Sequence, residues 1–145
     1  MTAFTFDPAD EKHARALARL DSEEIGWFGT VGRDGFPHAV PLWFLWHEGA
    51  AYIFSQPGSV KVKNLRENSR ALLHLEAGED GEQLQVLQGT VELSPEPTVA
   101  WLDRLGEPYL AKYAQGIANL GWTNDRMWSE YSTVLVFRPH KLIAW

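Results

Sequence analysis

The sequence of 145 residues contains no cysteine, which excludes a disulfide framework and any zinc site built on thiolates. No apolar run approaches the ~20 residues of a membrane helix, and the N-terminal segment lacks the apolar stretch of a secretory leader. We therefore expect a cytoplasmic protein without a membrane partner. Acidic residues outnumber basic ones by 19 to 13, which gives a net charge of −6. This charge argues against nucleic acid as the main partner, because such binding depends on neutralising phosphates.

The sequence is equally poor in motifs for side-chain chemistry. None of the five histidines has another one three or four positions away, so no metal site is expected. Neither a Gly-x-Ser-x-Gly nucleophile motif nor a glycine-rich phosphate-binding signature is present. Carboxylates gather only in the polar segment 78–82, where a solvated turn is the simpler interpretation. No catalytic residue is assigned, and an enzyme of this kind would rely on a cofactor to carry the reaction.

The basic segment 58–66 is the most informative part of the chain. Its Gly-Ser step predicts the start of a helix, with Ser59 capping the first turn. Lys61 and Lys63 lie in or beside that turn, where the helix dipole disfavours cations. A bound anion would remove this conflict, because a helix N-terminus flanked by ammonium groups binds phosphate well. A solvated basic surface is the alternative that needs no ligand.

Periodicity and turn residues predict one domain over residues 1–145, built mainly of strands. The six expected strands are 25–31, 38–46, 51–55, 70–77, 82–93 and 131–138. Helices are expected at 9–20, 59–67, 95–105 and 108–117, with a loop at 121–127 and a short tail at 142–145. The fifth strand changes its apolar face near Gly89, which predicts a bulge. Six short strands joined by hairpins fit a small antiparallel barrel.

Two features predict that part of the barrel wall is covered. Strand 38–46 is apolar on both faces, so we expect the barrel interior on one side and a helix or second subunit on the other. The chain also has seven tryptophans. Large flat side chains are typical of apolar ligand sites and of dimer interfaces, although packing in a β core explains many of them equally well.

Three parts of the sequence have an informative order and spacing: 29–31 with 35–44, 54–55 with 59–65, and 86–91. Together they resemble the flavin-binding split β-barrel family, which includes pyridoxamine phosphate oxidase-like proteins and deazaflavin (F420)-dependent oxidoreductases. The resemblance covers roughly 25–93, with a looser likeness in 134–145. It implies a mainly β fold with a few short helices: a six-stranded antiparallel split barrel. It also implies a homodimer with the cofactor in a groove between the subunits.

The same resemblance implies which residues bind the cofactor. Ser59 and Lys61 match the phosphate-binding positions, residues 40–43 match the segment along the ring edge, and Gln88 lies on the strand beneath the ring. Pro41 has no N–H to give to a neighbouring strand, which suits either a ligand alongside or a bulge at the barrel rim. The full predicted set is His38, Val40, Pro41, Leu42, Trp43, Phe54, Ser55, Ser59, Lys61, Lys63, Asn64 and Gln88.

One difference from the pyridoxamine phosphate oxidases bears on the cofactor. They usually carry an Arg-Lys pair where this chain has Val60 and Lys61. Loss of the arginine removes a bidentate phosphate contact that lysine cannot reproduce. The resemblance is therefore closer to the deazaflavin branch, and it implies that coenzyme F420 is the cofactor. The expected activity is transfer of hydride to a small unsaturated or aromatic substrate.

Two alternatives remain open at this stage. The first is an FMN-dependent oxidoreductase of the same family. The second is a non-catalytic protein that binds flavin, haem or another tetrapyrrole, for which only His38 or His140 would serve as an axial ligand. Trp122, Arg126 and Trp128, on the late loop, are candidates for walls of the substrate pocket, although ordinary loop packing is the simpler interpretation of each one.

Overall fold

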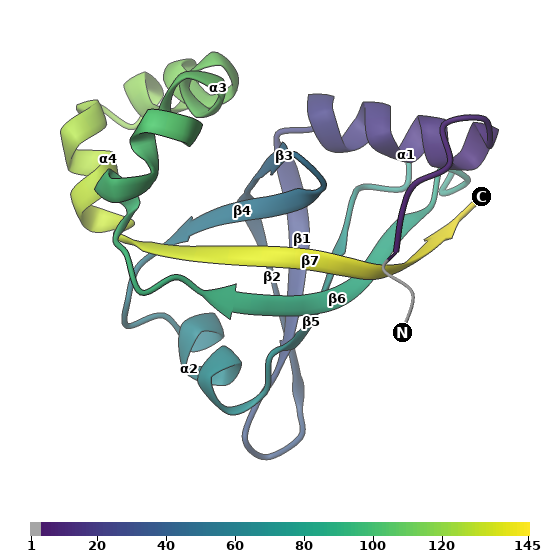
Figure 1. Ribbon diagram of the computed structural model, residues 1–145, viewed down its shortest axis with the longest axis horizontal. Coiled ribbons are helices and arrows are strands. Elements are labelled where there is room, and N and C mark those ends of the chain that lie inside the picture. The colour runs from purple at the N-terminus through teal and green to yellow at the C-terminus, as the bar shows by residue number, and fades with distance from the viewer. Residues whose placement is uncertain (1–3) are drawn as a thin grey trace.

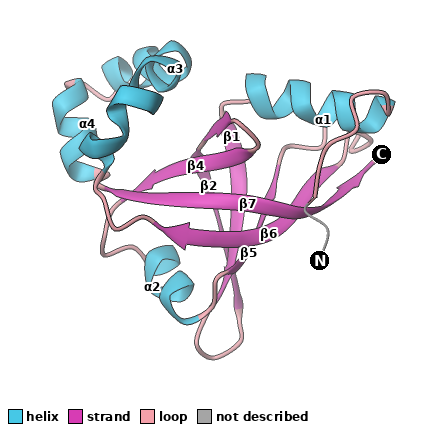
Figure 2. Cartoon of the chain, viewed as in Figure 1, coloured by secondary structure: helices cyan, strands magenta, loops and turns pink. Residues whose placement is uncertain are grey.

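The structure is a computed structural model that describes residues 4–145 as a curled sheet with helices on its outside (Figures 1 and 2). The strands are β1 (Ile25–Val31), β2 (Pro37–Trp43), β3 (Leu45–His47), β4 (Ala50–Ser55), β5 (Arg70–His74), β6 (Gln85–Leu93) and β7 (Thr133–Ala144). The helices are α1 (Glu11–Ser22), α2 (Val60–Glu67), α3 (Thr98–Asn119) and α4 (Asn124–Glu130).

The strands form one antiparallel sheet in the order β2-β1-β5-β6-β7-β4-β3. Strands β2 and β3 follow each other in the chain but lie at opposite ends of this order, so the sheet must curl to bring its two edges together. The edge of β2 thus approaches β4 without pairing with it. This arrangement confirms the predicted mainly β fold and its split barrel.

The predicted number of six strands is wrong, because the described residues form seven. The expected strand 38–46 is interrupted at Phe44. The Phe44 N–H donates to the hydroxyl of Tyr113 at 2.9 Å, and its carbonyl lies 2.7 Å from the same hydroxyl. A side chain on α3 therefore takes the backbone groups that a neighbouring strand would otherwise use, and the strand divides into β2 and β3.

The core has two apolar clusters, one on each face of β4. Phe28, Ile53 and Phe137 belong to the cluster inside the barrel, whereas Phe54 and Tyr109 belong to the cluster beneath α3 and α4. All six residues of β4 are buried as a result. The outward side of β2 differs, because residues 37, 39 and 41 are exposed in the single chain. The cover predicted for that side would have to come from a second subunit.

The C-terminal third departs most from the sequence-based expectation. Segments 95–105 and 108–117 were expected as two helices, but α3 runs as one helix of 22 residues through Pro108. Several of its buried residues recur at every fourth position: Leu105, Tyr109, Tyr113 and Ile117. Packing of this continuous stripe outweighs the hydrogen bond that the proline removes. The expected loop 121–127 instead contains the start of α4, which Thr123 caps.

The bulge predicted near Gly89 is confirmed. The pairing of β6 with β7 shifts between Gln88 and Gly89, so that one residue of β7, His140, has no opposite partner. A Cβ atom at Gly89 would overlap the carbonyl oxygen of Arg138, which explains why a glycine is needed here. Strand β7 continues past Pro139 to Ala144, although the sequence predicted its end at residue 138.

Candidate functional site

Helix α2 begins at the point where the open edge of β2 faces β4. Its first turn is capped as the sequence predicted, since the Ser59 hydroxyl accepts the N–H of Val62 at 3.4 Å. The same hydroxyl lies 3.0 Å from that of Ser55, the fully buried last residue of β4. These contacts tie the end of β4 to the start of α2 and so fix the position of Lys61 in the first turn.

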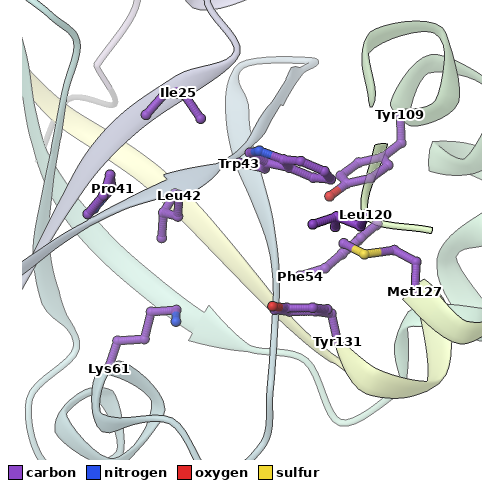
Figure 3. A pocket seen from close by; sticks show the side chains of 10 residues that line it. All are labelled: Ile25, Pro41, Leu42, Trp43, Phe54, Lys61, Tyr109, Leu120, Met127 and Tyr131. Carbon is purple, nitrogen blue, oxygen red and sulfur yellow. The ribbon is translucent and has the colours of Figure 1, made fainter. Parts of the chain in front are cut away.

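A hollow of about 340 Å³ lies beside Lys61 (Figure 3). Five residues of the predicted set line it together: Pro41, Leu42, Trp43, Phe54 and Lys61. They come from β2, β4 and α2, which surround the split of the barrel. The structure therefore brings the predicted ring-edge segment and the predicted phosphate-binding lysine to one place.

Among the described residues 4–145, Lys61 is the only charged one that lines this hollow. Its side chain is half-buried, and burial lowers the pKa of its ammonium group. The lysine forms none of the ion pairs found within residues 4–145. A partly desolvated cation without a counter-ion is stabilised when an anion binds beside it, so this end of the hollow suits a phosphate or carboxylate.

The open edge of β2 also offers backbone groups. A hydrogen bond closes the β1–β2 hairpin, and the register is unbroken to the pair of Ile25 with Trp43. Because bonding pairs alternate along antiparallel strands, the backbone groups of Ala39 and Trp43 face the open edge, whereas those of Val40 and Leu42 face β1. Pro41 lies between them and has no N–H. The N–H groups of Ala39 and Trp43 are therefore the donors that a ligand at this edge would find.

Two other predicted residues lie in a neighbouring hollow of about 540 Å³. His38 and Asn64 both line it, and the amide of Asn64 donates to the Thr30 hydroxyl at 3.0 Å. The Nδ1 atom of His38 is buried without a hydrogen-bond partner within residues 4–145. Val60 and Asn64 of α2 line this neighbouring hollow together with His38, and none of the three lines the hollow beside Lys61.

Lys63 and Gln88 are separated from Lys61 in the single chain. Lys63 is exposed, and two helical positions, or about 200°, turn it away from Lys61. Gln88 is exposed on β6 and borders a third hollow of about 810 Å³ on the outside of the sheet. His38 and His140, the only histidines considered for haem, border this third hollow as well.

The helical side of the site was not predicted. Tyr109, Leu120, Met127 and Tyr131 line the hollow from α3, α4 and the residues directly after these helices. The spacing of Tyr109, Tyr113 and Ile117 at every fourth position is typical of a buried helical stripe, but nothing local to the sequence indicates that α3 folds back over the split. Only the tertiary arrangement reveals this contribution.

The pocket walls that the sequence did suggest lie elsewhere. Trp122, Arg126 and Trp128 are absent from the lining of the hollow. Trp128 is buried behind it, with its ring 5.9 Å from that of Phe54 and 5.7 Å from that of Tyr109. Trp122 lies under the Arg126 guanidinium at 4.4 Å. Trp128 thus supports the wall from a second layer.

Comparison with known proteins places this architecture in a family. The model for pyridoxamine 5'-phosphate oxidase matches residues 11–145. The chain belongs to this family. Within residues 4–145, no three His, Asp or Glu side chains are grouped to hold a metal ion. In the same part of the chain, no helix has the length and apolarity to span a bilayer.

Solved structures with the same fold carry several different names. A protein named F420 reductase has a TM-score of 0.66 at 20% identity, over 87% of this chain and 94% of its own. A conserved hypothetical protein of Mycobacterium tuberculosis has a TM-score of 0.74 at 22% identity, over 100% of this chain and 89% of its own. The heme storage protein HutZ of Vibrio cholerae has a TM-score of 0.66 at 11% identity, over 97% of this chain and 95% of its own. These three likenesses concern the fold. No curated protein matches the sequence.

Proposed function

We propose that this protein is an oxidoreductase that binds coenzyme F420 at the split of the barrel and reduces a small unsaturated or aromatic compound. When bound, the deazaflavin ring supplies the hydride. The observation that carries the proposal is the position of Lys61. Its half-buried ammonium group forms no ion pair within residues 4–145 and lies beside the open edge of β2 and the aromatic walls of one hollow.

The residues present fit such a group. Lys61 offers one cation for an anionic substituent, and Val60, which stands in place of the family's arginine, is 52% exposed and adds no second charge. Trp43 and Phe54 provide flat apolar walls for a ring system. The N–H of Trp43 faces the open edge and can orient a polar ring atom. The protein thereby binds and positions the ring and keeps water from one side of it.

We further propose that a second copy of the chain completes the groove. Gln88 belongs to the predicted cofactor set but borders a different hollow from Lys61, so one cofactor can meet both residues only if two subunits contribute. The outward faces of β2 and β6 are uncovered in the single chain, where Pro37, Ala39 and Gln88 are exposed. A homodimer would bury this surface and place Gln88 of the partner subunit near the cofactor.

FMN is the second candidate cofactor, and the family match to pyridoxamine 5'-phosphate oxidase favours it. FMN has the same kind of tricyclic ring and a phosphate, so the hollow beside Lys61 suits it in the same orientation. An FMN enzyme would be yellow when purified and would need no deazaflavin.

A spectroscopic titration distinguishes these cofactors. We expect the purified protein to bind F420 at least about tenfold more tightly than FMN, as followed by the quenching of deazaflavin and flavin fluorescence. Tight binding of FMN with no binding of F420 would replace the proposal by the FMN alternative. A Soret band after addition of haemin, with neither of the other two binding, would contradict an oxidoreductase and support a tetrapyrrole-binding protein.

A further inference from the structure

The helical end of the hollow contains a phenol without a protein partner. Tyr109 is only 1% exposed, yet its hydroxyl takes part in none of the side-chain hydrogen bonds found within residues 4–145. Its neighbour Tyr113 contrasts with it, because the Tyr113 hydroxyl lies within 2.9 Å of three backbone atoms. Figure 3 shows the Tyr109 hydroxyl pointing into the hollow. Within residues 4–145, His38 Nδ1 is the one fully buried side-chain polar atom without a partner, so the Tyr109 hydroxyl still reaches the space of the hollow. An accepting ligand atom there can take the place of water.

The ring of Tyr109 lies among apolar side chains. The Tyr109 ring stacks on Phe54 with centroids 4.5 Å apart, and Leu120 and Met127 complete this end of the hollow. Burial raises the pKa of Tyr109 far above its ordinary value, and the nearby phenol of Tyr113 adds to the effect. Tyr109 therefore keeps its proton across the physiological range and acts as a donor of a hydrogen bond.

Lys61 and Tyr109 lie on opposite sides of the same hollow. In Figure 3, Lys61 projects from one side with Pro41 and Leu42, whereas Tyr109 stands with the helical residues on the other side. A volume of about 340 Å³ accommodates one small ring compound, so most of the proposed cofactor would lie outside the hollow, along the open edge of β2. The charged end and the phenolic end thus present different chemistry to two different ligands, or to two parts of one complex.

We propose that the end of the hollow formed by α3 and α4 is the substrate compartment. It takes a flat, uncharged ring compound with a carbonyl-type oxygen, and Tyr109 donates a hydrogen bond to that oxygen. This inference rests on the proposed function, in which the Lys61 end holds the anionic part of the cofactor. Tyr131 also lines the hollow, but it is half-exposed and packs against Trp122, so water satisfies its hydroxyl more readily.

A double-mutant cycle between protein and ligand tests this hydrogen bond. The probes are 1-indanone and indane, which share one bicyclic frame and differ by the carbonyl oxygen. Binding to the full chain without cofactor is followed by tryptophan fluorescence, since Trp43 lines the hollow. We expect Tyr109→Phe to lower the affinity for 1-indanone by about 3- to 10-fold and to leave the affinity for indane unchanged. Tyr52→Phe is the matched control, because Tyr52 is buried on β4 but does not line the hollow.

Several results would overturn the inference. One is that the wild-type protein does not bind 1-indanone. Another is that Tyr109→Phe weakens the binding of both probes equally. A third is that Tyr131→Phe, and not Tyr109→Phe, weakens the binding of 1-indanone alone. Titration of F420 into Tyr109→Phe keeps the two proposals apart. Retained F420 binding with loss of the carbonyl preference supports both proposals. If the wild-type protein does not bind F420 but Tyr109→Phe still weakens the binding of 1-indanone alone, the proposed function is wrong and the ring-binding compartment stands.

Discussion

Lys112 shows how one side chain links the helical cap to the barrel edge. Its ammonium donates to the Phe44 carbonyl at 2.8 Å and lies 3.9 Å from the centroid of the Phe44 ring. Burial lowers the pKa of this group to about 8, and the carboxylates of Asp21, Glu24 and Glu23 oppose the shift only in part. The folded protein therefore releases this proton at a lower pH than the unfolded chain does.

The stability of the protein should rise with pH between about 8 and 9.5 because of Lys112. In that range the unfolded chain still holds a proton that the folded state has lost, so raising the pH favours folding. The slope is at most about 1.4 kcal/mol per pH unit, and smaller because the ammonium partly reaches water. Urea unfolding at several pH values should show a flatter dependence for Lys112→Met. Lys63→Met, at an exposed position, should keep the wild-type slope.

A wild-type slope in Lys112→Met would show that the ammonium stays in water. The range must end below pH 10, because burial raises the pKa of Tyr109 and Tyr113. Those phenols act in the opposite sense, since the unfolded chain loses their protons first and stability then falls as the pH rises.

Single residues were predictable from the sequence where their role is local. The Ser59 cap and the position of Lys61 beside the ring-edge segment follow from neighbours in the chain or from the family resemblance. Tyr109 and Met127 were not predictable as site residues, because each reaches the hollow only after α3 and α4 fold against β4. Helical geometry alone predicts that Lys63 points away from Lys61, so this separation could have been predicted from the sequence.

At the scale of elements, the bulge between β6 and β7 is the feature with the strictest steric demand. A methyl group at Gly89 would overlap backbone atoms of Arg138, which cannot move like the end of a side chain. We expect Gly89→Ala to destabilise the protein by about 2 kcal/mol or more, measured by urea unfolding. The control is Gly58→Ala, where nothing lies within 4 Å of the added Cβ and stability should change little. Equal stability of the two variants would mean that the strands separate without cost.

The elements also show where sequence patterns stop being decisive. Strands β1, β4 and β6 followed from alternation and turns, and so did the bulge. The division of strand 38–46 did not, because it depends on the Tyr113 hydroxyl from a segment about 70 positions away. Pro108 was interpreted as a break for sound local reasons. The buried stripe of α3 outweighs that preference, and only the packed structure contains this information.

At the scale of the whole molecule, the proposed shared groove requires two chains. We expect sedimentation at micromolar concentration to give twice the mass of one chain, because the uncovered outer faces of β2 and β6 pair with each other or with neighbouring parts of a second copy. Only monomer at that concentration would contradict the shared groove. The fold class was predictable at this scale from the order of strands. The homodimer follows from the two apolar faces of strand 38–46 and from the family resemblance, and it stays a prediction.

Mixed dimers test the sharing of the groove itself. A dimer of one Lys61→Ala chain and one Gln88→Ala chain contains one site with both residues intact if each site draws Lys61 and Gln88 from different subunits. We then expect one tight cofactor site per mixed dimer in a fluorescence titration. If both residues act within one chain, every site carries a defect, and no tight site should be found.

The most direct test of the central claim compares cofactor affinity in Lys61→Ala and Lys63→Ala. Both variants lose one positive charge from α2, so long-range electrostatic effects are alike, and only the side that faces the hollow differs. We expect Lys61→Ala to weaken F420 binding by about 1–3 kcal/mol and Lys63→Ala to weaken it clearly less. Unchanged affinity in Lys61→Ala, or equal losses in both variants, would contradict an anion bound at the first turn of α2.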